Sequence, residues 1–245
     1  MAEREATSLP ATPGLLLYCI GGASLPLPDD VRGVRGGGLR RIVHGGLAAV
    51  VSPLAEPERL VPPATADLLE YERVIRSRHA EADVVPMRFG GVLADEGAVR
   101  AHLDAQRTAY QQALTRVAGC VELGVRALLS PPPPPTSTEP TTESRSRSGA
   151  DYLKARQRRY SAENRLREQG AEWERSLLSK VAPLCREHRL ELSPPRPGEP
   201  VLCSLYFLVP RDGVSGFREA ASLAMDGGPV KSTLSGPWPP FNFVG

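Results

Sequence analysis

The side chains that most often carry chemistry in proteins lie far apart in this sequence. Its cysteines form no CxxC pair and have no paired histidines. Cysteines in such a pattern usually behave as small buried hydrophobic residues rather than as zinc ligands or disulfide partners. We therefore expect no metal site and no cofactor from the four cysteines, which are Cys19, Cys120, Cys185 and Cys203.

The motifs that would indicate catalysis or phosphate binding are also missing. The glycine-rich stretch GVRGGG, residues 33–38, has the wrong spacing for a phosphate loop or a dinucleotide fingerprint. Asp95 and Glu96 stand at the start of a predicted helix and suit its dipole, while Glu122 lies in a predicted strand without an acidic partner. His44 precedes two glycines and is read as a turn residue. The sequence predicts that the protein is not an enzyme.

Composition narrows the class of protein further. Hydrophobic residues make up 41% of the 245 residues, which is enough for a core, and the net charge of +2 does not favour a general polyanion binder. The N-terminal stretch has no apolar segment of signal-peptide length, and the longest apolar run, residues 15–20, is too short to span a bilayer. We expect a cytoplasmic protein.

Periodicity predicts an N-terminal α+β domain over residues 1–118. A buried strand over 14–22 is followed by a hairpin over 39–51 that turns at Gly45-Gly46. A helix then places Leu68, Tyr71, Ile75 and Ala82 on one face, and a strand covers Val84–Phe89. Asp95 is predicted to cap one long helix with a single apolar stripe, made of Val99, Leu103, Gln106, Tyr110, Ala113, Leu114 and Val117.

A second domain is predicted over residues 119–235. A strand over 120–129 precedes a proline-rich and Ser/Thr-rich insertion, 130–149, which we expect to be disordered. A helix over 150–188 follows, with a kink at Pro183. Strands over 190–193, 201–209 and 230–234 and a helix over 214–225 complete a β-α-β-β-α-β order, which is ferredoxin-like. The predicted stripe of the long helix is Trp173, Leu177, Val181, Leu184 and His188.

The long helix carries the strongest local positive charge. Glutamates interleave with its arginines, which favours a solvated or protein-facing helix over a nucleic-acid surface. A nucleotide- or RNA-binding regulatory protein on a ferredoxin-like scaffold remains the alternative. The arginines are Arg156, Arg158, Arg159, Arg165 and Arg167, and the glutamates are Glu163, Glu168, Glu172 and Glu174.

Three stretches together resemble the gas vesicle protein L/F family: VVPMRFGGVLADEGAVRAHL, YFLVPRDGVSGFREA and the ending GPWPPFNFV. The resemblance spans nearly the whole chain. It implies a two-domain α+β accessory or minor structural protein of gas vesicles, the gas-filled protein shells that provide buoyancy. The implied partners are the shell protein and other accessory proteins, with no nucleic acid and no membrane. The family offers no catalytic residue to transfer to this chain.

The first of these stretches supplies four candidate structural or interface residues: Pro86, Arg88, Phe89 and Gly90. Arg88 lies in an otherwise apolar run, so its guanidinium is predicted to be buried and to satisfy backbone carbonyls or a carboxylate between the two domains. The alternative is that Arg88 contacts a partner protein.

The tail, residues 236–245, supplies the other candidates. Its prolines predict an extended and stiff segment close to polyproline II. Its aromatic residues are predicted to fold back into a groove on the protein's own surface between the domains, and the alternative is that they bind the shell protein or another assembly factor. The candidates are Trp238, Pro239, Pro240, Phe241 and Phe243.

Overall fold

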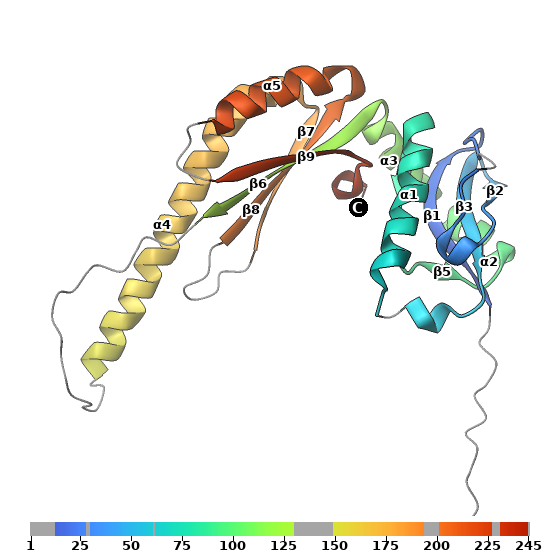
Figure 1. The fold of residues 1–245 in the computed structure, drawn as a ribbon, viewed down its shortest axis with the longest axis horizontal. Helices are drawn as coiled ribbons and strands as arrows, with labels where there is room; N and C mark the ends of the chain where they lie inside the picture. Colours follow the sequence, from blue (N-terminus) through green and yellow to red (C-terminus); the bar gives the residue numbers. More distant parts are fainter. Residues whose placement is uncertain are drawn as a thin grey trace, which may run out of the picture. The chain divides into compact units, whose positions relative to one another are not determined.

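The structure is a computed structural model that describes residues 13–27, 30–60, 62–129, 149–193, 201–226 and 231–244. The chain divides into two compact units (Figure 1). The first comprises Met1–Glu122 together with Trp238–Gly245, and the second comprises Leu123–Pro237. The predicted disordered insertion lies outside the described residues, apart from Gly149, which begins a helix.

The first unit contains an antiparallel sheet with the strand order β2-β3-β1-β4, in which β5 also pairs with β1. The hairpin between β2 and β3 turns at Gly45 and Gly46, whose φ angles of 57° and 81° favour glycine. This turn was predicted correctly. The strands are β1 (Gly14–Gly22), β2 (Arg40–His44), β3 (Leu47–Leu54), β4 (Val84–Pro86) and β5 (Val92–Leu93).

Helix α1 (Thr65–Glu81) packs on this sheet through Tyr71, Val74 and Ile75. The prediction that Leu68 lies on the buried face was wrong, since 40% of Leu68 is exposed. Asp67 takes the buried place in the first turn because it pairs with Arg35, whose guanidinium lies 2.8 Å from Asp67 Oδ2. Arg35 belongs to a short 3-10 helix, η1 (Val34–Gly36), and a second one, η2, spans Pro57–Leu60.

The long helix predicted after Asp95 is two helices, α2 (Glu96–Ala105) and α3 (Arg107–Val117). Asp95 caps α2 as predicted, because its Oδ1 accepts a hydrogen bond of 2.8 Å from the Ala98 N–H. Gln106 separates the helices with a non-helical backbone (φ −110°, ψ 11°) and is exposed, so its placement in the apolar stripe was wrong. Each helix buries its own short apolar stripe instead. One straight helix would not turn both stripes toward the sheet.

The second unit is a four-stranded sheet with the strand order β7-β8-β6-β9 and two helices. Leu205 and Phe207 on β8 form its core with Leu177 on α4 and Phe217 on α5. The elements follow the predicted order and are β6 (Cys120–Leu129), α4 (Gly149–Val181), β7 (Glu187–Leu192), β8 (Val201–Pro210), α5 (Val214–Met225) and β9 (Ser232–Trp238), with the 3-10 helix η4 (Arg211–Gly213) before α5. The predicted α+β class is confirmed.

Helix α4 ends at Val181, seven residues before the predicted end. Pro183 stops the helix rather than kinking it, since proline has no N–H to donate and its ring clashes with the preceding turn. Residues Ala182–Leu184 form the 3-10 helix η3. His188 therefore lies on β7, and its predicted place on the helical stripe was wrong.

Two predicted strands also have different ends. The strand predicted over Val84–Phe89 stops at Pro86, while the last strand runs from Ser232 to Trp238. The tail is extended as part of β9 only as far as Trp238. After Trp238 it folds into the 3-10 helix η5 (Phe241–Phe243), in which the Phe243 N–H donates to Pro240 O at 3.1 Å.

Candidate interaction surface at the C-terminal tail

Tyr71 on α1 holds the backbone of the stretch from Pro86 to Gly90. Its hydroxyl lies 2.8 Å from Leu17 O and 3.1 Å from Met87 O, so it bridges β1 and the residues that follow β4. Burial raises the pKa of Tyr71, which keeps the phenol protonated as a donor. The ring also meets Phe89 edge-on at 5.1 Å between centroids.

Arg88 is exposed, which contradicts the prediction that it is buried. Only its backbone is used: Arg88 O lies 3.2 Å from the Tyr71 hydroxyl. Its guanidinium forms no hydrogen bond or ion pair with the described part of the chain. Pro86 is buried opposite Cys19 on β1, and Gly90 takes a φ of 95° at the turn beyond Phe89.

Among the described residues of this unit, the buried arginine is Arg78, at the end of the apolar face of α1. Its Nη1 donates to Pro26 O at 2.7 Å, and its Nη2 lies 3.0 Å from Glu81 Oε1. Sequence reasoning missed this residue. The sequence did hold one signal: Arg78 follows Tyr71 by seven residues, which places both on the apolar face of the helix.

The tail docks on the first unit. Phe243 is fully buried, Pro239 and Pro240 are buried, and Val244 packs against the cluster that contains Val99. Helix α3 lies against η5. The tail therefore contributes part of the core of this unit.

Glu122 on β6 fastens the tail to the start of that strand. Its carboxylate accepts two hydrogen bonds from Asn242, one at 2.8 Å from the backbone N–H and one at 2.7 Å from Nδ2. The carboxylate is almost completely buried. Two charge-assisted bonds help to offset the cost of burying this carboxylate.

Trp238 and Phe241 are the tail aromatics that stay accessible. Trp238 is half-buried, and the guanidinium of Arg76 on α1 lies 5.1 Å from the centre of its ring, which is a cation–π distance. Phe241 is 37% exposed. Of the nine candidate residues, Arg88, Trp238 and Phe241 have side chains that are accessible to solvent. The other six contribute to the fold.

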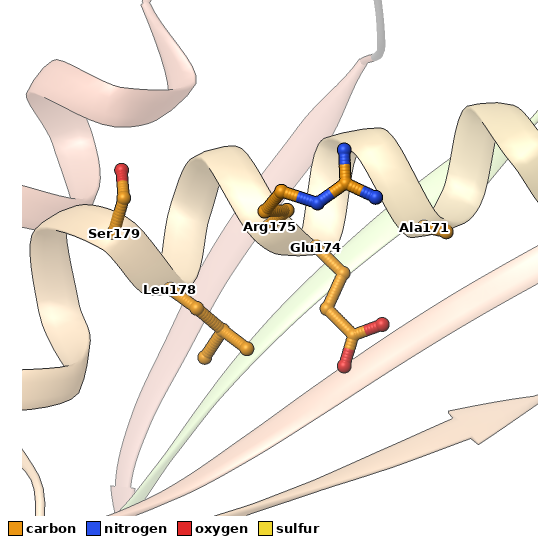
Figure 2. Close-up of a pocket in the computed structure, with 5 residues that line it drawn as sticks. All are labelled: Ala171, Glu174, Arg175, Leu178 and Ser179. Carbon is orange, nitrogen blue, oxygen red and sulfur yellow. The ribbon is translucent and has the colours of Figure 1, made fainter.

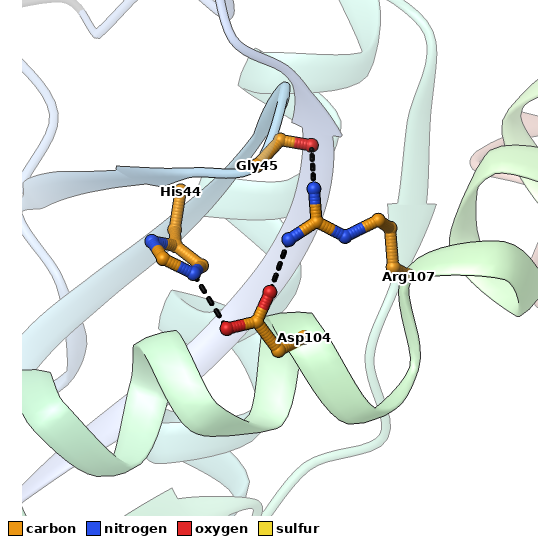
Figure 3. A network of polar contacts seen from close by, with 4 residues as sticks. All are labelled: His44, Gly45, Asp104 and Arg107. Carbon is orange, nitrogen blue, oxygen red and sulfur yellow. Dashed lines mark hydrogen bonds and ion pairs between the residues drawn. The ribbon is translucent and has the colours of Figure 1, made fainter.

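A polar network joins the β2–β3 hairpin to the junction of α2 and α3 (Figure 3). Asp104 bonds Arg107 and also His44, whose Nε2 lies 2.6 Å from Asp104 Oδ2. Arg107 also donates to Gly45 O at 3.0 Å. The hydrogen bonds from Arg107 and then from His44 lower the pKa of Asp104. All of these groups are at least partly exposed, and they tie the turn to the helix junction.

Three hollows on the described surface are shallow. The one drawn in Figure 2 is lined entirely by α4, with Leu178 and Glu174 on one side of the helix and Ser179 and Arg175 on another. Hollows on α3 and at the end of α5 are likewise each lined by one helix. Since ligand pockets enclose most of their ligand, these hollows do not support a small-molecule site.

The prediction that the cysteines are buried is confirmed for three of the four. Cys19, Cys120 and Cys203 are buried, Cys185 is half-buried, and none of the four forms a disulfide. Burial raises the pKa of Cys19 to about 12 and that of Cys203 to about 11, which favours the protonated thiol over the thiolate at neutral pH. Among the described residues, no group of three or more His, Cys, Asp or Glu side chains could hold a metal ion. No helix in those residues is both long and apolar enough to cross a membrane.

The fold is shared with solved gas vesicle proteins. The crystal structure of GvpF from Microcystis aeruginosa matches with a TM-score of 0.73 at 14% identity, over 95% of this chain and 99% of that chain. GvpF from Anabaena sp. PCC7120 matches with a TM-score of 0.71 at 17% identity, over 95% and 96%. The fold therefore defines a mixed α+β protein with antiparallel sheets, similar to those two structures.

Sequence comparison gives the family. The profile of the family described as "Gas vesicle synthesis protein GvpL/GvpF" matches residues 14–245, and the chain belongs to that family. Two relatives come from Streptomyces sp. (strain CB03234). "Gas vesicle protein L" is 29% identical over 89% of this chain and 88% of its own length. "Gas vesicle protein F" is 28% identical over 93% and 98%. The predicted family resemblance is confirmed.

Proposed function

We propose that this protein acts in gas vesicle assembly through direct contacts with the shell protein and with other accessory proteins. The observation that supports this most strongly is the family match over residues 14–245, which includes the Arg88 stretch and the tail. Accessory proteins of this kind need surfaces rather than active sites, so we infer no enzymatic activity. We place the protein in the cytoplasm, associated with gas vesicles.

The residues that we propose for these contacts are Arg88, Trp238 and Phe241, each of which is at least partly exposed. An aromatic side chain left accessible beside an arginine is the composition that binding hot spots favour. Arg76 already lies over Trp238, so a partner would meet an aromatic surface with positive charge beside it.

A pull-down tests this proposal. The full chain is immobilised and offered the shell protein and the other accessory proteins, one at a time. We expect retention of at least one of them, and we expect the double variant Arg88→Ala/Phe241→Ala to lose it while its unfolding midpoint stays unchanged. A matched control replaces Leu223, an exposed apolar residue on α5, by alanine.

The same experiment addresses the alternative class. Retention of RNA at physiological salt without any retention of the shell protein or the accessory proteins would support a nucleotide- or RNA-binding regulator and overturn the assembly role. Nucleic-acid binding of that kind would fall steeply with salt.

We also propose that the second unit is a ferredoxin-like domain. Its strand order β7-β8-β6-β9 with helices α4 and α5 supports this assignment. The proposed domains are then residues 1–118 and 119–235 with the tail 236–245, although the first unit of the structure also includes residues up to Glu122 and the tail from Trp238.

A further inference from the structure

Strand β7 forms one edge of the second sheet and carries two exposed leucines. No strand in the described part of the chain pairs with that side. Leu190 is 39% exposed and Leu192 is 49% exposed. The unpaired N–H and C=O groups of an edge strand are a template for pairing with another strand.

The other sheet edges are blunted in ways that natural sheets use. On β9, Pro237 has no N–H to offer, and Arg218 on α5 bonds the oxygen of Gly236. Strand β4 is only three residues long. On β2, Arg40 pairs with Glu96 and Arg41 bonds Leu25 O. Strand β7 has six residues, contains no proline and carries its charged side chains on one face.

The pairing of β7 with β8 determines which backbone groups point outward. The Ser193 N–H donates to Leu202 O, the residue directly opposite, at 2.9 Å. Directly opposite bonded pairs recur at every second residue of an antiparallel ladder, so the odd-numbered residues of β7 bond to β8. The N–H and C=O groups of His188, Leu190 and Leu192 therefore point to the free edge.

Side chains on β7 alternate in the same way. Glu187, Arg189 and Glu191 lie on one face, the face of Tyr206 and Ser204 on β8. Arg189 lies 3.9 Å from Glu187 within the strand. The leucines lie on the other face, since Leu190 is opposite Leu205. The strand thus presents a negative–positive–negative row on one face and exposed leucines on the other.

This charge row selects one register for pairing with an identical strand. Antiparallel self-pairing centred on Arg189 or on Glu191 places like charges opposite each other, which destabilises a sheet. Centring on Leu190 places each Arg189 opposite the second copy's Glu191, and Leu190 opposite Leu190. Centring on His188 or Leu192 shifts the two copies along each other, so that several residues of each β7 have no opposite residue on the other copy.

We propose that β7 is a self-association edge, on which β7 of a second copy of this chain pairs antiparallel in the register centred on Leu190. In that register the outward backbone groups of His188, Leu190 and Leu192 bond one another across the two-fold axis. The two sheets join into one continuous sheet. This inference is independent of the proposed assembly role.

The test is the molar mass of the purified full chain, measured by light scattering over a range of concentrations. We expect a dimer for the wild-type chain. Each of the single variants Arg189→Glu and Glu191→Arg places like charges opposite each other, and we expect their dimer dissociation constants to rise at least about tenfold. The two single variants mixed together restore opposite charges at both positions, so the mixture should form a heterodimer.

A backbone variant separates pairing from side-chain effects. Leu190→Pro removes an N–H that points away from β8, so the β7–β8 ladder and the fold should persist while the dimer is lost. Far-ultraviolet circular dichroism confirms folding. A wild-type chain that stays monomeric at all concentrations overturns the proposal, and so does a Leu190→Pro variant that still dimerises. Single charge variants that dimerise like the wild type overturn the register.

Discussion

Glu122 and Asn242 are 120 residues apart in sequence, and two hydrogen bonds join them in the structure, at 2.8 Å and 2.7 Å. Glu122 lies at the beginning of β6 and Asn242 lies in η5. The contact therefore joins the C-terminal tail to the start of β6. The tail, which the sequence predicted to fold back on the protein's own surface, packs in part into the core of the first unit.

We predict that Glu122→Ala destabilises the protein by about 1–3 kcal/mol, because the amide donors of Asn242 lose their buried acceptor. Glu122→Gln keeps one acceptor oxygen and should lose less. Urea unfolding measures both variants, and carboxypeptidase digestion reports release of the tail. Equal stability of the alanine variant and the wild-type chain would show that the tail docks without this contact.

The two phenylalanines of η5 should differ sharply. Phe243→Ala is expected to cost about 3–5 kcal/mol, because it empties a fully buried site. Phe241→Ala should stay within about 0.5 kcal/mol of the wild-type chain, because Phe241 is exposed. The matched pair is compared by urea midpoint. Truncation after Trp238 keeps β9 intact and should destabilise more than Phe243→Ala, because it also removes Asn242 from Glu122. Truncation after Leu234 would also remove part of β9.

Arg78 and Arg88 form a second matched pair. We expect Arg78→Ala to destabilise by about 3–5 kcal/mol, because it removes a buried charge that bonds Pro26 O and Glu81. Arg88→Ala should leave stability within about 0.5 kcal/mol. The measurement is thermal unfolding by circular dichroism. A large loss from Arg88→Ala would restore the structural role that the sequence suggested.

The Asp104 network predicts a pH dependence. Because Arg107 and His44 lower the pKa of Asp104 in the folded state, the ionised carboxylate stabilises the fold. This contribution is complete above the unfolded pKa of about 4 and is lost as the pH falls through the lower folded value. Asp104→Asn should therefore be less stable than the wild-type chain near neutral pH, and the difference should shrink in acid. A difference that does not change between pH 7 and pH 3 would contradict this.

The proline-rich insertion has a minimum length. Leu129 at the end of β6 lies against Gly170 on α4, since a Cβ at Gly170 would meet Leu129 Cδ1 at 3.0 Å. The first residue of α4 is then about 31 Å away along the helix. An extended chain needs at least about nine residues to cover that distance.

We therefore expect a Gly/Ser replacement of residues 131–148 by about ten or more residues to leave the helix content unchanged. A four-residue replacement should unwind the first turns of α4 and reduce the helical circular dichroism signal. Neither change should lower the melting temperature much, because the described side chains from Gln157 to Gln169 are exposed. A large drop with the longer replacement would show that the insertion itself packs.

Local chemistry made much of this fold predictable from sequence. The Gly45-Gly46 turn, the Asp95 cap and helix α5 depend on neighbouring residues only, because positive φ angles, capping bonds and helical periodicity act over a few positions. The family resemblance also rested on contiguous motifs. The wide spacing of the cysteines, with no CxxC pair, also favoured buried thiols.

Long-range packing decided what the sequence left open. Arg78 and Arg88 are the same residue type in partly apolar surroundings, and only the position of α1 on its sheet buries one and exposes the other. Glu122 had no visible partner until the fold brought Asn242 to it. The sequence by itself determined the family, the local turns and caps and most elements. The tertiary structure decided which charges are buried, because burial depends on distant residues whose positions no local pattern encodes.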